Sequence, residues 1–91
     1  MKYIKVKWLH ELKDEPVILL SELDDDRYEV RKIEIFSDGR VGFASGTQEV
    51  GGTMLGEVPV PSIDELVADP QFFIEDFSGA KFETAWRLNK E

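Results

Sequence analysis

Apolar and polar residues alternate along the first segment of the chain, the pattern of a strand with one covered face. Ile4, Val6 and Trp8 share one parity, and lysines occupy positions of the other parity. This alternation predicts a strand over residues 3–9. Residues 17–23, VILLSEL, are nearly all apolar, which is typical of a strand covered on both faces.

A third strand is predicted over residues 28–36, although its alternation slips in the middle. Tyr28 and Val30 have one parity, whereas Ile33 and Ile35 have the other. A β-bulge near the intervening arginine, Arg31, would bring all four apolar side chains to one face.

A hairpin is predicted after that strand. Asp38 and Gly39 suit a tight turn because glycine tolerates positive φ, and residues 41–45 form the returning strand. Residues 46–61 hold four glycines and two prolines. They predict a long irregular connection, with room for a short strand around residues 48–50.

The first helix is predicted over residues 62–69. Ser62 followed by Glu65 is a capping box, in which the serine hydroxyl accepts a hydrogen bond from the backbone N–H three residues later. Its expected inward stripe is Ile63, Leu66 and Val67.

The second helix is predicted over residues 78–89. Phe77 and Phe82 stand at the two positions of a hydrophobic staple. Phe82, Ala85 and Trp86 follow the spacing i, i+3 and i+4, which makes one apolar helix face. We expect both Trp86 and Trp8 to belong to the core.

These elements predict an α+β fold, in which an antiparallel sheet of about four or five strands carries two C-terminal helices packed on one face. We expect residues 1–91 to form a single domain, since a chain of this length fits one compact core. Residues 71–76 receive no assignment, and the strand order is left open.

Composition narrows the classes of function. The 19 acidic residues against 11 basic ones give a net charge of −8, which disfavours nucleic-acid binding. There is no cysteine, so thiolate chemistry and disulfides are excluded. No apolar run approaches a membrane span of roughly 18 residues, and the first residues lack the apolar run of a signal peptide. We therefore expect a soluble, cytoplasmic protein without a membrane partner.

Two motif-like segments fail as cofactor sites. Asp24, Asp25 and Asp26 are candidate oxygen ligands for Ca²⁺ or Mg²⁺, but Glu29 stands where an EF-hand loop needs glycine. Residues 46–53, GTQEVGGT, resemble a phosphate-binding loop but carry Gly52 in place of its lysine. We therefore predict neither a metal site nor a cofactor.

The block ELDDDRYEVRKIEIFSDGR, residues 22–40, carries a family resemblance together with the opening YIKVKWLH and the later GGT. These segments resemble a family of small bacterial domains of unknown function. The resemblance supplies no activity, so it implies no catalytic residues.

The leading hypothesis is a non-enzymatic module that binds a basic protein partner, with a toxin-neutralising immunity protein as one version. Its interaction candidates are Asp24, Asp25, Asp26, Arg27, Gly51 and Gly52, from the loops 24–27 and 46–56.

The alternative is a small-molecule-binding protein or minor enzyme with a site near residues 46–56. Its candidate residues are His10, Arg31, Arg40 and Glu49. His10 is the single histidine, which could act as a general base or cap the end of a strand. A homodimer joined through an exposed strand edge is compatible with both hypotheses.

Overall fold

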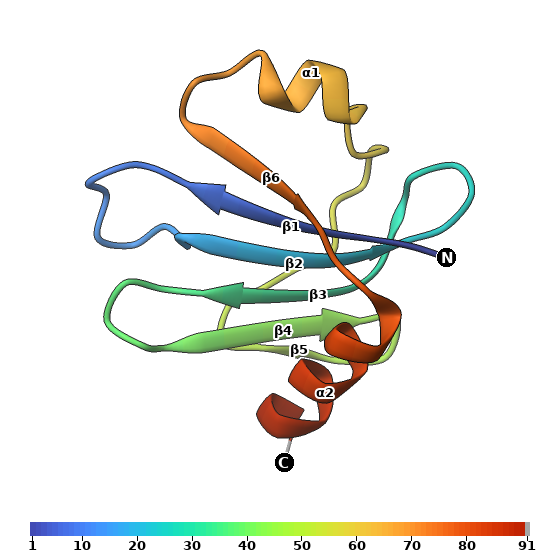
Figure 1. Cartoon of the computed structure of the whole chain (residues 1–91). Coiled ribbons are helices and arrows are strands. Elements are labelled where there is room, and N and C mark those ends of the chain that lie inside the picture. Colours follow the sequence, from blue (N-terminus) through green and yellow to red (C-terminus); the bar gives the residue numbers. More distant parts are fainter. Residues whose placement is uncertain (91) are drawn as a thin grey trace.

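The computed structural model describes residues 1–90, whose strands form one antiparallel sheet accompanied by two helices (Figure 1). The strands are β1 Lys2–Trp8, β2 Ile18–Leu23, β3 Glu29–Ile35, β4 Val41–Ser45, β5 Glu49–Val50 and β6 Phe72–Asp76. The helices are α1 Ile63–Val67 and α2 Gly79–Lys90. The strand order across the sheet is β5-β4-β3-β2-β1-β6. The predicted α+β class is therefore confirmed.

The sheet has six strands rather than the predicted four or five. Short β5 extends one edge, and β6, from the unassigned residues 71–76, forms the other edge beside β1. Phe72 pairs with Trp8 and Ile74 with Val6, so alternate β6 side chains reach an apolar face of the sheet. Pairing with β1 thus gives this ambiguous segment its strand structure.

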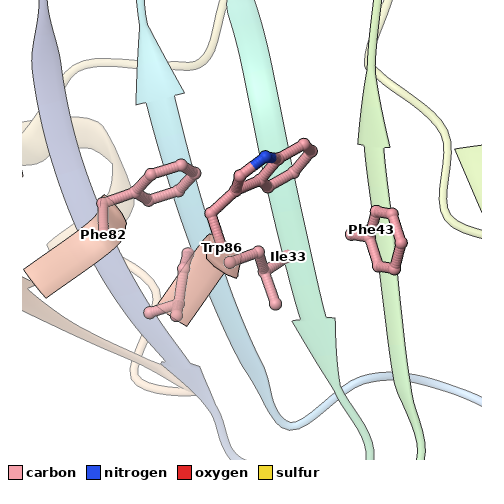
Figure 2. Close-up of a cluster of buried hydrophobic side chains, with 5 residues drawn as sticks. Ile33, Phe43, Phe82 and Trp86 are labelled. Atoms are coloured by element: carbon pink, nitrogen blue, oxygen red, sulfur yellow. The ribbon is translucent and has the colours of Figure 1, made fainter. Parts of the chain in front are cut away.

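Helix α2 covers one face of the sheet (Figures 1 and 2). Its Phe82 and Trp86 pack with Ile33 of β3 and Phe43 of β4, as the predicted apolar helix face requires. Ser78 caps the helix, because its Oγ accepts a hydrogen bond from the Lys81 backbone N–H at 3.1 Å. This layer was correctly predicted.

The opposite face is covered by α1 and by residues 51–61, called here the crossing segment. Ile4 and Val6 lie on this face with Leu66 of α1 and Val60 of the crossing segment. In Figure 1 the crossing segment passes behind the strands towards α1. The prediction that both helices pack on one face is therefore wrong, because the crossing segment carries the chain to the other face.

Helix α1 packs only one residue of its predicted inward stripe against the sheet, and that residue is partly buried. Leu66 packs against the sheet, whereas Ile63 is 41% exposed and Val67 53% exposed. The Ser62 cap itself is confirmed, since the Glu65 backbone N–H donates to its Oγ at 3.3 Å. The helix therefore meets the sheet through Leu66, at one edge of the stripe that these three side chains share.

Strand β3 contains the predicted irregularity. Glu22 pairs with Arg31 while Leu23 pairs with Glu29, which leaves Val30 as the extra residue of a bulge. The bulge does not bring Tyr28 into the core, as the 42% exposure of that side chain shows.

Side chains of β3 hold the crossing segment against the sheet. Thr53 Oγ1 donates to Glu34 at 2.8 Å, and the Gly56 backbone N–H donates to Glu29 at 2.6 Å. Lys32 Nζ donates to the Met54 carbonyl at 3.3 Å. These contacts supply hydrogen-bond partners to a stretch of backbone that has no strand or helix of its own.

The start of the crossing segment fits closely over β4. Gly51 and Gly52 turn the chain with φ of 73° and 81°, which favour glycine. A Cβ built on Gly42 would lie 2.1 Å from Thr53 Oγ1, so any side chain there would displace the buried threonine. The packing therefore requires glycine at position 42.

Replacing Gly42→Ala is expected to lower the free energy of unfolding by about 1–3 kcal/mol, because the added methyl overpacks the contact with Thr53. Urea denaturation measures the change. Gly46→Ala is the matched control: it meets open space and should change stability by less than about 0.5 kcal/mol. Equal stability of the two variants would contradict this account of the packing.

Candidate functional site

The loop between β2 and β3 is an ordered turn built around Asp24. The Asp24 Oδ1 accepts hydrogen bonds from the backbone N–H groups of Asp26 at 2.9 Å and Tyr28 at 3.0 Å. Arg27 adopts a φ of 66° to close the turn. The Asp25 and Asp26 side chains are left exposed, and neither forms an ion pair within the described residues 1–90.

Arg27 links this loop to the end of the crossing segment. Its Nε donates to the Val60 carbonyl at 2.9 Å, and its Nη2 donates to the Pro61 carbonyl at 2.8 Å. The Val60 backbone N–H donates in return to the Arg27 carbonyl at 2.8 Å. Three hydrogen bonds therefore fix the acidic loop beside the residues that lead into α1.

Apolar side chains are exposed on both sides of that junction. Tyr28 follows Arg27 directly, Val58 is 71% exposed, and Ile63 begins α1 two residues after Pro61. Together with the two free carboxylates they form what we call the acidic-apolar surface: Asp25, Asp26, Tyr28, Val58 and Ile63.

Sequence reasoning found only the acidic half of this surface. Tyr28 and Ile63 have spacings typical of buried residues, and only the packing of β3 and α1 leaves them outside the core. Val58 offered a signal, because an apolar residue between Glu57 and Pro59 in an irregular stretch has no partner that periodicity can supply.

The glycines among the interaction candidates serve the fold. Gly51 packs against Gly42, where a Cβ would lie 2.9 Å from the Gly42 Cα. Gly52 is exposed and supplies the second left-handed residue of the same turn. The turn places Thr53 on Glu34 and lies at the opposite end of the crossing segment from Arg27.

Arg31 occupies a charged cluster between β3 and α2. Its Nε and Nη2 donate to Glu22 at 2.7 and 2.8 Å, and its guanidinium also donates to Glu83 of α2. Tyr3 Oη donates to Glu22 at 2.7 Å. The guanidinium carbon lies 5.0 Å from the centroid of the Phe82 ring. The cluster therefore joins α2 to the sheet.

Proton affinities in the cluster follow these contacts. Hydrogen bonds from Arg31 lower the pKa of Glu22, against the opposing effect of its burial, and lower the pKa of Glu83. Hydrogen bonds to the same carboxylates raise the pKa of Arg31, and the bond to Glu22 raises the pKa of Tyr3. The shifts at Glu22, Glu83 and Arg31 favour their ionised pairs at neutral pH, and the shift at Tyr3 keeps its hydroxyl protonated as a donor to Glu22.

His10 is engaged at both ring nitrogens. Its Nε2 lies 2.8 Å from the Pro16 carbonyl oxygen, and its Nδ1 accepts a hydrogen bond from the Leu12 backbone N–H at 2.9 Å. This pattern fits the neutral ring with the proton on Nε2. The side chain therefore closes the loop between β1 and β2, the capping role anticipated for a histidine at a strand end.

The four alternative ligand-site candidates lie in separate places. Arg31 faces α2, and Arg40 pairs with Asp38 at 2.7 Å in the turn between β3 and β4. Glu49 is exposed on β5, and His10 lines a broad, open hollow of about 590 Å³ beside the β1–β2 loop. The structure does not bring these side chains together into one site.

Metal and membrane features are not found in the part of the chain that the structure describes. Within residues 1–90, no three His, Cys, Asp or Glu side chains gather as they would around a metal ion. Over the same residues, neither helix combines the length and the apolar character that crossing a membrane requires.

A second pocket, of about 240 Å³, lies on the sheet face opposite α2. It is lined by Trp8 and Leu19 of the sheet, by Val60, and by Leu66 of α1. The sequence did not predict this pocket, because its walls come from segments far apart in the chain.

Comparisons with known proteins identify a family without assigning an activity. A family model described as a domain of unknown function (DUF6881) matches residues 2–91. Searches of curated proteins and of solved structures found no match.

Replacing Glu22→Gln is expected to destabilise the protein by about 2–4 kcal/mol at pH 7, because it leaves the guanidinium of Arg31 without its buried partner. The pKa of Glu22 is lowered in the folded state, so its contribution is present above the unfolded value of about 4.3 and is lost as the pH falls through the folded value. Urea denaturation at several pH values between about 3 and 7 measures both the loss of stability and its pH dependence.

The Glu22→Gln variant should therefore lose stability less steeply than the native protein as the pH falls below about 4.3. Glu49→Gln removes a carboxyl from an exposed site and serves as the control. Parallel pH profiles for the native protein and Glu22→Gln would refute the linkage.

Proposed function

This chain belongs to the family described as a domain of unknown function (DUF6881), and we propose that it is a non-enzymatic module that binds a basic protein. The acidic-apolar surface is the binding site in this proposal. A toxin neutralised in the manner of an immunity protein is one form that the basic partner could take. We place this role in the bacterial cytoplasm, in keeping with the family resemblance and the cysteine-free composition.

The observation that carries the proposal is the exposure of apolar side chains beside carboxylates that have no internal partner. Tyr28, Val58 and Ile63 offer area that a partner can remove from water. Asp25 and Asp26 supply charge that attracts a basic partner during encounter and fixes its orientation. The combination suits a binding surface with an apolar centre and a charged rim.

Rigidity of the surface supports the same role. Asp24 caps the loop from within, and Arg27 ties it to the Val60 and Pro61 carbonyls. A surface that is ordered before binding loses less conformational entropy when the partner arrives. Asp24 and Arg27, which the sequence suggested for binding, thus stabilise the surface through internal hydrogen bonds.

The alternative, a ligand site near residues 46–56, has weaker support. Its candidates Arg31 and Arg40 are paired with carboxylates, and His10 has no ring nitrogen free. General acid–base catalysis needs such groups positioned around one substrate.

The test is affinity capture from a bacterial lysate at low salt with a surface variant, Asp25→Asn, Asp26→Asn and Ile63→Ser combined. We expect the native protein to retain a basic partner that high salt releases, because screening weakens exposed charge pairs. The variant should lose that partner, and with the purified partner it should associate several-fold more slowly at low salt.

A matched control changes the same kinds of side chain elsewhere. Asp14→Asn, Glu15→Gln and Leu12→Ser alter two exposed acids and one exposed apolar residue in the β1–β2 loop. This control should bind like the native protein. Equal retention of the partner by the surface variant would overturn the proposal, as would the consistent lack of any basic partner.

A further inference from the structure

Strand β6 is an edge of the sheet that lacks several features by which proteins keep edges from pairing. Edge strands are often shortened, bulged, or blocked by lysine or proline, because their free backbone groups can pair with another strand. Residues 72–76, FFIED, contain neither lysine nor proline, and they pair with β1 without a bulge. The opposite edge, β5, has only two residues. Strand β6 is therefore the edge better suited to accept a further strand.

The outward backbone groups of β6 have no partner. The Leu9 N–H donates to the Gln71 carbonyl at 2.7 Å, and positions that face β1 alternate with positions that face away from it. Phe72, Ile74 and Asp76 therefore direct their N–H and carbonyl groups outward. Within the described residues 1–90, no hydrogen bond is found to the outward groups of Ile74 and Asp76.

The side chains on the α2 side of β6 permit the approach of another strand. Phe73 is 56% exposed, so a partner strand could remove apolar area from water there. Glu75 shares this side, and its carboxylate pairs with Lys5 at 3.7 Å and with Lys7 at 3.2 Å. The charge of Glu75 is thus balanced within the protomer.

One register of a second, antiparallel β6 matches these backbone groups. The Phe72 N–H already donates to the carbonyl of residue 69 at 3.1 Å, so Phe72 offers only an acceptor. With Ile74 opposite its own copy, the two Ile74 residues exchange two hydrogen bonds, and each Asp76 N–H meets a Phe72 carbonyl. A register centred on residue 75 would set two glutamates opposite each other, and one centred on residue 73 would move Asp76 beyond the ladder.

We propose that β6 is a self-association edge that pairs with β6 of a second copy of this chain, antiparallel and centred on Ile74. Each Phe73 then lies opposite Glu75 of the second copy, and the two Asp76 residues lie more than about 13 Å apart, at roughly 3.3 Å for each residue. A five-residue edge buries less than the roughly 1,600 Å² of a standard interface, so we expect a Kd of about 0.01–1 mM. The pairing uses none of the residues of the acidic-apolar surface.

Sedimentation equilibrium of the full chain tests the proposal. We expect a monomer–dimer equilibrium in which dimer increases between about 0.05 M and about 0.5 M salt, because salt screens the repulsion between two copies of net charge −8. The basic partner proposed above is released by salt, so the two associations respond in opposite directions. A chain that stays monomeric up to about 2 mM, above the expected Kd range, would overturn the proposal.

Two substitutions at residue 73 test the register. Phe73→Glu sets carboxylates opposite Glu75 of the second copy and removes apolar contact, so it should weaken dimerisation about tenfold or more. Phe73→Lys faces the same carboxylate with an opposite charge, so its Kd should stay within about threefold of the native value. Leu88→Glu makes the same kind of change at a 76% exposed position of α2 and should leave dimerisation intact.

Asp76→Pro tests the backbone pairing. It removes an outward N–H without removing a bond to β1, which an edge strand tolerates, so the monomer should fold and the dimer should be lost. Circular dichroism checks the folding of each variant, and the exposed Phe73 variants keep the proposal testable if Asp76→Pro does not fold. Equal weakening by Phe73→Glu and Phe73→Lys would overturn the proposed register. Native dimerisation by Phe73→Glu or by folded Asp76→Pro would overturn the interface itself.

Discussion

Both faces of the sheet are apolar, and the one long helix, α2, can cover only one of them. Phe82 and Trp86 of that helix close the face that carries Ile33 and Phe43. The other face, which carries Ile4 and Val6, must be removed from water by whatever chain remains. That chain is the crossing segment with short α1, and its position sets the place of the pocket and the acidic-apolar surface.

Covering a sheet with irregular backbone creates a hydrogen-bonding problem that charged side chains solve. A helix satisfies its own backbone groups and a strand pairs with its neighbours, but the crossing segment does neither. Glu29, Lys32 and Arg27 supply partners to its N–H and carbonyl groups, and Glu34 accepts from its threonine. Much of the charged block 22–40 is therefore structural, which explains how this block can be dense in charge without indicating an activity.

Local patterns predicted the elements whose structure depends on their own sequence. The Ser78 cap and the spacing of Phe82 and Trp86 specify α2, and alternation specifies β1. Strand β6 was not predicted, because its pairing with β1 is a long-range contact. The outward position of Ile63 depends in the same way on where α1 meets the sheet.

The same difference between local and long-range contacts decides which candidate sites could be predicted from the sequence. Asp25 and Asp26 could be found from the sequence, because a run of acids between two strands predicts an exposed loop. The pocket could not, because Trp8, Val60 and Leu66 meet only after the chain has crossed the sheet. Trp8, which we expected in the core, is instead half-buried at the end of β1.

The crossing segment is attached to the sheet mainly by side chains, whereas the strands are joined by continuous backbone ladders. Segments with few backbone hydrogen bonds open with less free energy than the whole domain. Residues 54–58 can therefore detach briefly while the strands stay paired and Val60 stays bonded to Arg27, in a sub-global opening. Such openings would be much more frequent than unfolding of the whole domain.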